Sequence, residues 1–253
     1  MVRKLDGTVA LVTGASSGIG RATALELARE GAAVALVGRR EDRLMDLAAE
    51  VDGAGGKSLV VAVDVSDEPG AAEAVRRTVE ALGRLDTLVN NAGLMLLGPA
   101  PGADLADWRR MVDINLMGLM FCTHAAVPHL VKAAATEPRQ VADVVNVSSL
   151  SGRMAFGMSA VYCATKFGVG AFSEALRQEL ALQHVRVSVV EPGSVDTELR
   201  GHNPPAVQEQ LASHLGRIER LSSEDVAETI GYIVTRPRHV AVAEVLVRPT
   251  EQV

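Results

Sequence analysis

Tyr162 and Lys166 are the residues whose types and spacing most directly suggest chemistry. On a helix beginning near Ser159, their side chains would lie one turn apart on the same face. A phenol has a reference pKa of about 10, and a neighbouring ammonium group lowers that pKa because it favours the phenolate. Such a tyrosine can protonate a carbonyl oxygen or take a proton from an alcohol. The spacing alone favours the alternative, a helix with a half-buried tyrosine and a solvated lysine.

A glycine-rich turn near the N-terminus indicates a nucleotide site. The apolar run Thr8–Thr13 predicts a buried strand, and helical periodicity follows from Ala22 to Ala28. Glycines between a strand and a helix let the backbone approach a pyrophosphate, which is favoured at a helix N-terminus. The alternative is that the glycines only ease a tight turn. The candidate cofactor ligands in this turn are Gly14, Ser16, Ser17, Gly18, Ile19 and Gly20.

The residues that follow the second predicted strand, 33–37, decide which cofactor is selected. A carboxylate there would bind the ribose 2′-hydroxyl of NAD, whereas an arginine accommodates the 2′-phosphate of NADP. This chain has Gly38 followed by Arg39 and Arg40, and arginine is well shaped for phosphate recognition. We therefore predict NADP(H) as the cofactor, with Arg39 preferred over Arg40 as the phosphate ligand. The alternative is that both arginines cap the next helix in solvent.

Polar and small residues also follow the later predicted strands. Ligands of open α/β sheets bind at the carboxyl ends of the strands, where these residues would gather. Asp64 and Val65 end the third strand (59–63), and the Asp64 carboxylate would meet either the adenine amino group or the N-terminus of the next helix. The fourth (85–89), fifth (144–149) and sixth (185–190) strands end in further candidates: Asn91, Ala92, Gly93, Ser149, Pro192 and Gly193.

Three segments of the chain would shape a substrate site. Asn115 lies in a helical region predicted over 104–135 and interrupted near Pro128. Its buried amide needs partners, either in a structural hydrogen bond or around a catalytic water at a kink. The apolar run Leu94–Leu97 would pack inward or line a pocket. The segment at about 194–216, rich in glycine and proline from residue 198 onward, predicts a mobile lid or a short helical flap.

The composition limits the classes of protein that fit this sequence. The 253 residues are 48% hydrophobic but only 3% aromatic, and no linker-like segment divides them, so we expect one domain over 1–253 with a core of alanine, valine and leucine. A net charge of −6 disfavours a general nucleic-acid surface. Cys122 and Cys163 provide neither a metal-ligand cluster nor a disulfide framework. No signal peptide is visible, and the apolar stretch 114–131 predicts a buried helix rather than a membrane span. We expect a soluble cytoplasmic protein.

Together these motifs resemble the single-domain short-chain dehydrogenase/reductase family. The resemblance implies a Rossmann-type, doubly wound, seven-stranded parallel sheet of order 3-2-1-4-5-6-7 with helices on both faces. It rests on motifs that occur in order along almost the whole chain: Thr13-Gly14-x-x-x-Gly18-Ile19-Gly20, Asn90-Asn91-Ala92-Gly93, Asn115, Ser149, Tyr162-x-x-x-Lys166 and Pro192-Gly193. Within the family, segments 91–99, 196–202 and 248–253 resemble clavulanic acid dehydrogenase-like members, and the C-terminal strand more broadly resembles NADP-dependent 3-hydroxy acid dehydrogenase-like members.

The resemblance also implies residue roles. Tyr162 would be the general acid/base, and Lys166 would bind the nicotinamide ribose and lower the tyrosine pKa. Ser149 would hydrogen-bond the substrate oxygen, and Asn115 would hold a water that relays protons to Lys166. A homotetramer is implied, with the Asn115 and Tyr162 helices as candidate interface elements. The residues implied to line the remaining cofactor site are Asn91, Ala92, Gly93, Pro192, Gly193, Val195 and Thr197.

The expected function is an NADP(H)-dependent oxidoreductase that transfers a hydride between nicotinamide and a small carbonyl or alcohol substrate, such as an aldehyde or ketone. One alternative is a non-catalytic NADP redox sensor, and another is an NAD-preferring alcohol dehydrogenase. A sugar-nucleotide epimerase or dehydratase shares the Tyr-x-x-x-Lys spacing but usually needs a longer chain with a separate substrate domain.

Overall fold

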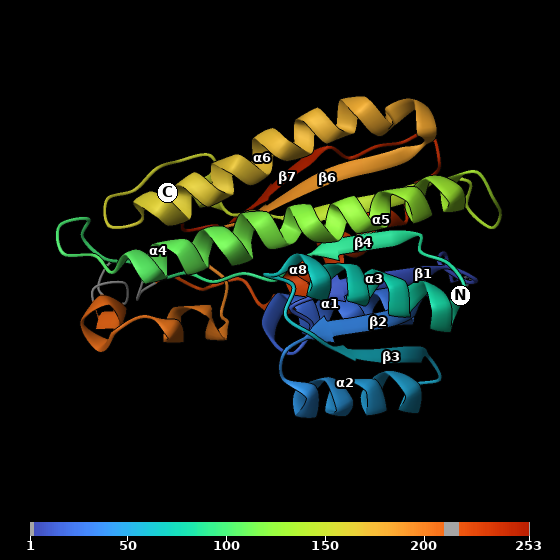
Figure 1. Ribbon diagram of the computed structural model, residues 1–253, viewed down its shortest axis with the longest axis horizontal. Coiled ribbons are helices and arrows are strands. Elements are labelled where there is room, and N and C mark those ends of the chain that lie inside the picture. The colour runs from blue at the N-terminus through green and yellow to red at the C-terminus, as the bar shows by residue number, and fades with distance from the viewer. Residues whose placement is uncertain (1–2, 210–217, 253) are drawn as a thin grey trace.

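A parallel sheet of seven strands forms the centre of the molecule, in the order β3-β2-β1-β4-β5-β6-β7 (Figure 1). The computed structural model describes residues 3–209 and 218–252. The predicted strand order is confirmed, and the order reverses between β1 and β4, where sheets of this kind bind ligands. The strands are β1 (Val9–Thr13), β2 (Ala33–Gly38), β3 (Lys57–Ala62), β4 (Thr87–Asn90), β5 (Ala142–Val147), β6 (Val185–Pro192) and β7 (Glu244–Val247).

Strands β1 and β2 are almost wholly apolar because both faces of the sheet are covered around them. In β1 every residue is buried. Ala10 and Val12 point into one core cluster, and Leu11, between them, points into the cluster on the other face. Side chains alternate between the two faces of a strand, so a continuous run of valine, alanine and leucine supplies both cores at once.

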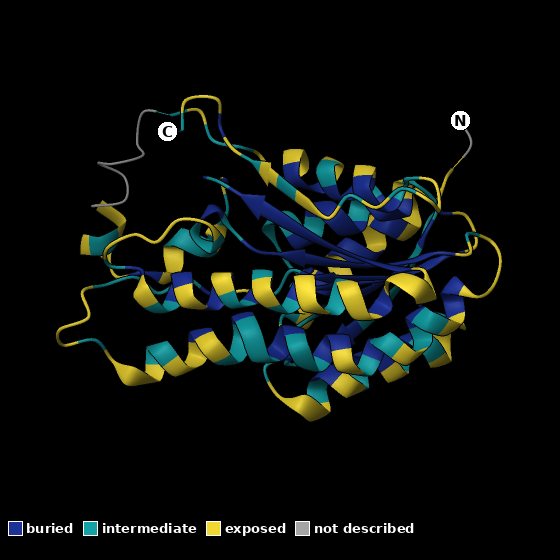
Figure 2. Ribbon diagram, turned by 90° about the horizontal axis from the view of Figure 1, so that it is seen from above, coloured by how far each residue is buried: buried dark blue, intermediate teal, exposed yellow. Residues whose placement is uncertain are grey.

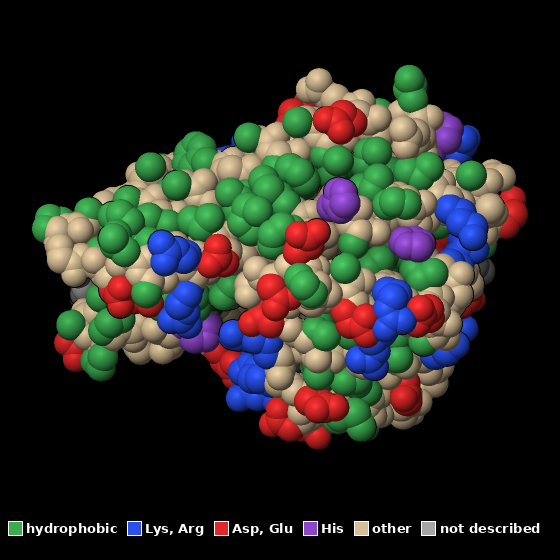
Figure 3. Space-filling view, viewed as in Figure 1, with side chains coloured by type: hydrophobic (Ala, Val, Ile, Leu, Met, Phe, Trp, Pro, Cys, Tyr) green, Lys and Arg blue, Asp and Glu red, His purple; other side chains and the backbone are tan. Residues whose placement is uncertain are grey.

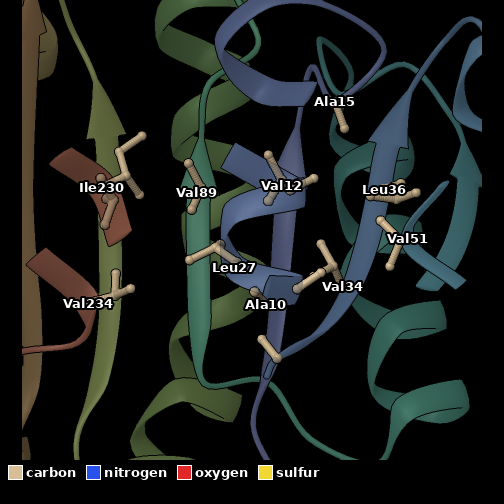
Figure 4. Packing of buried hydrophobic residues seen from close by; sticks show 14 of the residues in the cluster. Ala10, Val12, Ala15, Leu27, Val34, Leu36, Val51, Val89, Ile230 and Val234 are labelled. Carbon is tan, nitrogen blue, oxygen red and sulfur yellow. The ribbon is translucent and has the colours of Figure 1, made fainter. Parts of the chain in front are cut away.

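Helices pack on both faces of the sheet. One core holds Leu27 of α1, Val51 of α2 and Ile230 of α8 (Figure 4), and the other holds side chains of α3, α5 and α6. Burying each of these large side chains stabilises the fold by roughly 1.5–3 kcal/mol. The helices are α1 (Gly18–Arg29), α2 (Glu41–Gly53), α3 (Glu68–Leu82), α4 (Leu105–Val112), α5 (Gly118–Ala134), α6 (Ala160–Leu180) and α8 (Ser223–Val234).

The long helical region after β4 is interrupted, but not where the sequence predicts. The helix runs through Pro128 without a break, within α5. A π-helical turn, Asp113–Met117, instead separates α4 from α5 and contains Asn115. The prediction of an interruption near Pro128 is therefore wrong. π-Turns occur frequently at functional sites, and this one lies beside the candidate catalytic residues.

The C-terminal third departs from expectation in its details. The last strand, β7, covers only Glu244–Val247 rather than the predicted 240–247, and it alternates between exposed and half-buried residues, as an edge strand does. The predicted flap begins with a short 3₁₀ helix, Glu198–His202, and residues 205–209 are helical. The remainder of that predicted segment, 210–216, lies outside the described residues.

The helical run Leu105–Ala134, π-turn included, is long and apolar enough to span a membrane by length and composition, a test that core helices of soluble proteins also pass. Cys122, Ala126 and Leu130 on its inner face lie in the core. Along the helices, exposed and half-buried residues occupy the outer faces, while strands β1, β4, β5 and β6 are buried throughout (Figure 2). The predicted buried helix is therefore buried on one face only.

Candidate active site

Tyr162 and Lys166 lie on the first turns of α6, both almost fully buried. The Lys166 ammonium donates a hydrogen bond to the carbonyl oxygen of Val147, 2.9 Å away, at the carboxyl end of β5. Its Nζ lies 5.9 Å from the centroid of the Tyr162 ring. Ser149, two residues past Val147, lies near enough to the phenol of Tyr162 to lower its pKa. The end of β5 and the start of α6 thus bring Ser149, Tyr162 and Lys166 together.

Burial, rather than the neighbouring lysine, controls the proton affinity of Tyr162. Burial raises the pKa of Tyr162 to about 12, and the nearby Ser149 side chain opposes this only in part. Burial also lowers the pKa of Lys166 to about 8. The expectation that Lys166 lowers the tyrosine pKa stays a prediction, because in the chain itself burial sets the direction of the shift. The phenol stays protonated at neutral pH, which is the form that can donate a proton.

Asn115 has its side-chain amide engaged by the protein. Its Oδ1 accepts a hydrogen bond from the Leu94 amide nitrogen at 2.7 Å, and its Nδ2 donates to the Leu94 carbonyl at 2.8 Å and to Thr165 Oγ1 at 3.2 Å. Both amide hydrogens are therefore used. The structure shows the structural hydrogen bonds, and the catalytic water at a kink stays a prediction. The side chain fixes the Leu94–Leu97 loop against α6.

The apolar loop after β4 packs against the tyrosine. Leu94, Met111 and Tyr162 form one buried cluster, with Met95, Leu96 and Leu97 partly buried around it. The loop is held at its far end as well, because the Gly98 amide donates to the Met158 carbonyl at 2.8 Å, just before α6. Of the two alternatives for this run, packing inward and lining a pocket, the cluster shows the first and places the loop beside the phenol.

The glycine turn fits a dinucleotide phosphate. Gly14 and Gly18 have φ values of +67° and +53°, which side chains rarely adopt. A Cβ on Gly20 would come within 2.3 Å of the Gly14 carbonyl oxygen, so only glycine allows this close packing. The side chain of Ser17, at the N-cap of α1, makes no capping hydrogen bond. First-turn N–H groups of a helix without such a cap are free to bind an anion.

Asn91 secures this turn to the neighbouring strand. Its side-chain Nδ2 donates to the Thr13 carbonyl at 3.0 Å, while Thr13 Oγ1 accepts the amide hydrogens of Asn91 and Ala92, each at 3.0 Å. A Cβ on Gly14 would lie 2.9 Å from both Asn91 and Ala92. The Asn91–Gly93 segment therefore borders the glycine turn, with the Asn91 amide turned towards its backbone.

The two arginines after β2 point to different partners. Arg40 donates to Ser16 Oγ from Nε at 3.0 Å and to Ser17 Oγ from Nη2 at 2.7 Å. Arg39 faces the Asp64 carboxylate, with 3.6 Å between Nη1 and Oδ2. The guanidinium that lies against the phosphate turn is thus that of Arg40, whereas Arg39 lies at the end of β3. The preference for Arg39 as the phosphate ligand stays a prediction, tested below.

Asp64 stays at the carboxyl end of β3 and caps no helix. Its carboxylate accepts hydrogen bonds from the Ser66 amide at 3.0 Å and the Ser66 hydroxyl at 2.8 Å, while Asp67 is the N-cap of α3. Burial opposes ionisation of Asp64, but the Ser66 hydrogen bonds and Arg39 outweigh it and lower the pKa of the carboxyl group. Val65, next to it, is buried in the core.

The segment after β6 runs back across the glycine turn. Gly193 donates to the Val247 carbonyl at 2.7 Å, and Val195 pairs with Leu221 in an isolated bridge. The Thr197 methyl would lie 3.2 Å from a Cβ on Gly18. The structure thus brings the predicted nicotinamide segment, Pro192–Thr197, to the N-terminus of α1.

Three contacting residues were not singled out by the sequence. Asn203 accepts a hydrogen bond from the Leu97 amide at 2.6 Å and donates to the Met95 carbonyl at 3.0 Å, which ties the flap to the apolar loop. Gln252 accepts one from the Ser194 amide at 2.9 Å. Glu198 binds Arg40 and Arg43. Their partners lie far away in the chain, so no local pattern indicates these contacts.

A parallel sheet with this strand order, a glycine turn at its reversal point and a serine, tyrosine and lysine at the neighbouring strand end define a dinucleotide-dependent oxidoreductase of the short-chain type. Residues 8–208 match the family model described as short chain dehydrogenase, and the chain belongs to that family.

The chain is similar to several named members of the family. It is 40% identical over 245 residues to sulfoacetaldehyde reductase 2 of Chromohalobacter salexigens, covering 96% of this chain and 95% of that protein. It is 39% identical over 248 residues to the glycine betaine reductase ATRR of Emericella nidulans, covering 98% of this chain but only 19% of that longer protein. The closed form of a serine dehydrogenase complexed with NADP⁺ superposes with a TM-score of 0.88 at 31% identity, covering 97% of this chain and 96% of that one.

Proposed function

We propose that this oxidoreductase is an NADP(H)-dependent carbonyl reductase and alcohol dehydrogenase acting on small aldehydes or ketones, with Tyr162 as the general acid/base. The observation that carries the proposal is the gathering of Ser149, Tyr162 and Lys166 at the carboxyl edge of the sheet. Its likeness to a reductase named for an aldehyde and to a dehydrogenase solved with NADP⁺ supports the same reaction.

Each residue of the site has a defined part in carbonyl reduction. Nicotinamide, when bound, supplies the hydride to the carbonyl carbon. Tyr162, kept protonated by burial, gives its proton to the carbonyl oxygen as negative charge develops there. The Ser149 Oγ accepts the Ser151 amide hydrogen at 3.1 Å, so its own hydroxyl hydrogen remains available to hold the substrate oxygen.

Lys166 acts as a positioning group for the cofactor ribose. One of its three ammonium hydrogens goes to Val147, and two remain for ribose hydroxyls. Pro192, Gly193, Val195 and Thr197 would surround the nicotinamide. Asn115 supports the site by holding Leu94, and a water relay to Lys166 would use groups other than its side-chain amide hydrogens.

The surroundings of Tyr162 favour an apolar or modestly polar substrate. Leu94–Leu97 pack beside the phenol, and Met154 and Phe156, in the loop before α6, are exposed. Arg153 in the same loop is neutralised by Glu191 and Glu244. Arg200 donates to Ser194 Oγ at 2.5 Å. Because the residues packed beside the phenol are apolar, a phosphorylated substrate is disfavoured.

The proposed assembly is a homotetramer. Figure 3 shows a broad apolar surface over α5 and α6, and Val112 and Phe167, on α4 and α6, expose 36% and 44% of their surface. Helix faces of this kind in a protein without a membrane role are typical of contacts between subunits. The Asn115 and Tyr162 helices would then stabilise each other's position through the interface.

A substrate panel tests the proposal directly. Purified protein is mixed with NADPH and a series of aldehydes and ketones, and with NADP⁺ and the matching alcohols, while absorbance of the reduced cofactor is followed. We expect turnover with at least one aldehyde or ketone, and faster turnover with NADPH than with NADH. Tight NADPH binding without turnover of any member of the panel would favour the redox sensor, and a preference for NADH would favour the NAD-dependent alternative.

A further inference from the structure

Glu198, the first residue of the short 3₁₀ helix after the nicotinamide segment, forms ion pairs with two arginines that lie far away in the chain. Its Oε2 lies 2.8 Å from Arg40 Nη1, and its Oε1 lies 2.6 Å from Arg43 Nη1. Each carboxylate oxygen thus binds a different guanidinium. Figure 3 shows basic side chains gathered between α2 and the 198–209 segment.

The position of this carboxylate is unusual because Arg40 already belongs to the phosphate turn. The same guanidinium donates to the Ser16 and Ser17 hydroxyls at 2.9 Å and 2.7 Å. Carboxylate and phosphate oxygens are both recognised by the planar guanidinium fork. An acidic side chain therefore lies on the set of donors that a 2′-phosphate would use.

The Glu198 carboxylate is charged throughout the neutral range. Hydrogen bonds from Arg40 and Arg43, together with their positive charges, outweigh burial and lower the pKa of Glu198 to about 2. All three side chains keep between 40% and 49% of their surface exposed. Contacts this exposed are weak and are screened by salt, so a doubly charged phosphate can displace the carboxylate.

We propose that Arg40 and Arg43 form the recognition site for the cofactor 2′-phosphate, and that Glu198 occupies this site as an internal competitor until NADP(H) displaces it. The inference rests on the proposed use of NADP(H). It adds Arg43 and Glu198 to the residues that set cofactor affinity, and it predicts that the free chain holds its phosphate site in a preformed but self-occupied state.

The competitor is joined to the substrate side of the molecule. Five residues after Glu198, Asn203 hydrogen-bonds to Met95 and Leu97, which pack beside Tyr162. The turn between them is short, since Asn203 also donates to the Arg200 carbonyl at 3.2 Å. When a phosphate replaces the Glu198 carboxylate at Arg40 and Arg43, the 198–203 segment therefore loses these ion pairs. This is the segment that is hydrogen-bonded to the Leu94–Leu97 loop beside Tyr162.

Calorimetric titration of two small probes tests the competition without turnover. Adenosine 2′,5′-bisphosphate carries the 2′-phosphate, and 5′-AMP lacks it. Glu198→Gln should bind the bisphosphate about fivefold to tenfold more tightly than the wild type, with 5′-AMP affinity unchanged. Arg43→Gln should weaken bisphosphate binding by about tenfold. In the double variant the gain from Glu198→Gln should shrink, because one of its two partners is gone.

A control variant with the same change in charge distinguishes competition by Glu198 from a general electrostatic effect. Glu73→Gln also removes a carboxylate from an exposed arginine pair, on α3, and should leave both affinities unchanged. The inference is overturned if Glu198→Gln binds the bisphosphate no more tightly than the wild type, or if Glu73→Gln produces the same gain. If the wild type binds the bisphosphate no better than 5′-AMP, the proposed NADP(H) preference fails as well. A clear 2′-phosphate preference with an unresponsive Glu198 variant overturns this inference alone.

Discussion

The glycine turn and the tyrosine pocket lie along one sheet edge but differ in how far their charged groups are exposed. Around the glycine turn, Arg40, Arg43 and Glu198 are half exposed and joined in ion pairs. In the tyrosine pocket, Lys166 and Tyr162 are buried, and Lys166 donates to a backbone carbonyl. Exposed charges recognise a ligand and exchange partners cheaply, whereas buried groups have shifted proton affinities. In the proposed mechanism, recognition and proton transfer are thus separated in space.

This contrast predicts that the largest effects follow from changes in the buried pocket. Lys166→Met removes the ammonium that would hold the ribose, and we expect kcat to fall on the order of 100-fold. Steady-state kinetics with the best substrate of the panel measure it. Lys57→Met, at the exposed start of β3, is the control and should retain wild-type turnover. An active Lys166→Met enzyme would remove Lys166 from the mechanism.

The same variant has a signature in the pH dependence of stability. The pKa of Lys166 is lowered from 10.5 to about 8 in the folded chain by burial, so between these pH values the unfolded chain binds more protons. The free energy of unfolding therefore rises with pH across this window, by on the order of 3 kcal/mol from this group. Denaturant titrations should show a smaller rise in Lys166→Met than in the wild type. Equal slopes would mean that the folded Lys166 has an ordinary pKa.

We expect a smaller effect at the exposed cluster of Arg40, Arg43 and Glu198. It distinguishes Arg40 from Arg39 as the ligand of the 2′-phosphate. The sequence prefers Arg39 as the phosphate ligand, but Arg40 is the one bonded to the serines of the turn. We expect Arg40→Gln to weaken NADPH binding by about tenfold relative to NADH, and Arg39→Gln to do less. Fluorescence titration of both reduced cofactors measures the ratio. A larger loss with Arg39→Gln would restore the sequence-based preference.

Much of the fold could be predicted because its signals are local. Buried parallel strands favour apolar runs, and 9–13 and 33–38 show them together with the small or polar turns that follow. The capping box at Ser222 and Asp225, which begins α8, is equally local. Pro128 misled the prediction because a proline in a helix removes one hydrogen bond but does not always end the helix.

The site was less predictable because its properties depend on tertiary contacts. The direction of the Tyr162 pKa shift is set by burial, and the four-residue spacing between Tyr162 and Lys166 carries no information about burial. Asn115 was identified, but its hydrogen bonds to Leu94 require knowledge of where that loop lies. Glu198 and Arg40 are separated by 158 residues, and only the return of the chain across the glycine turn brings them together.

The most direct test of the central claim compares Tyr162→Phe with the wild type, in both chemistry and cofactor binding. The variant removes one buried hydroxyl group and keeps the ring that packs with Leu94 and Met111. We predict that carbonyl reduction falls on the order of 10³-fold, while the Kd for NADPH stays within about twofold of the wild type. Unchanged turnover in Tyr162→Phe would contradict the assignment of Tyr162 as the proton donor.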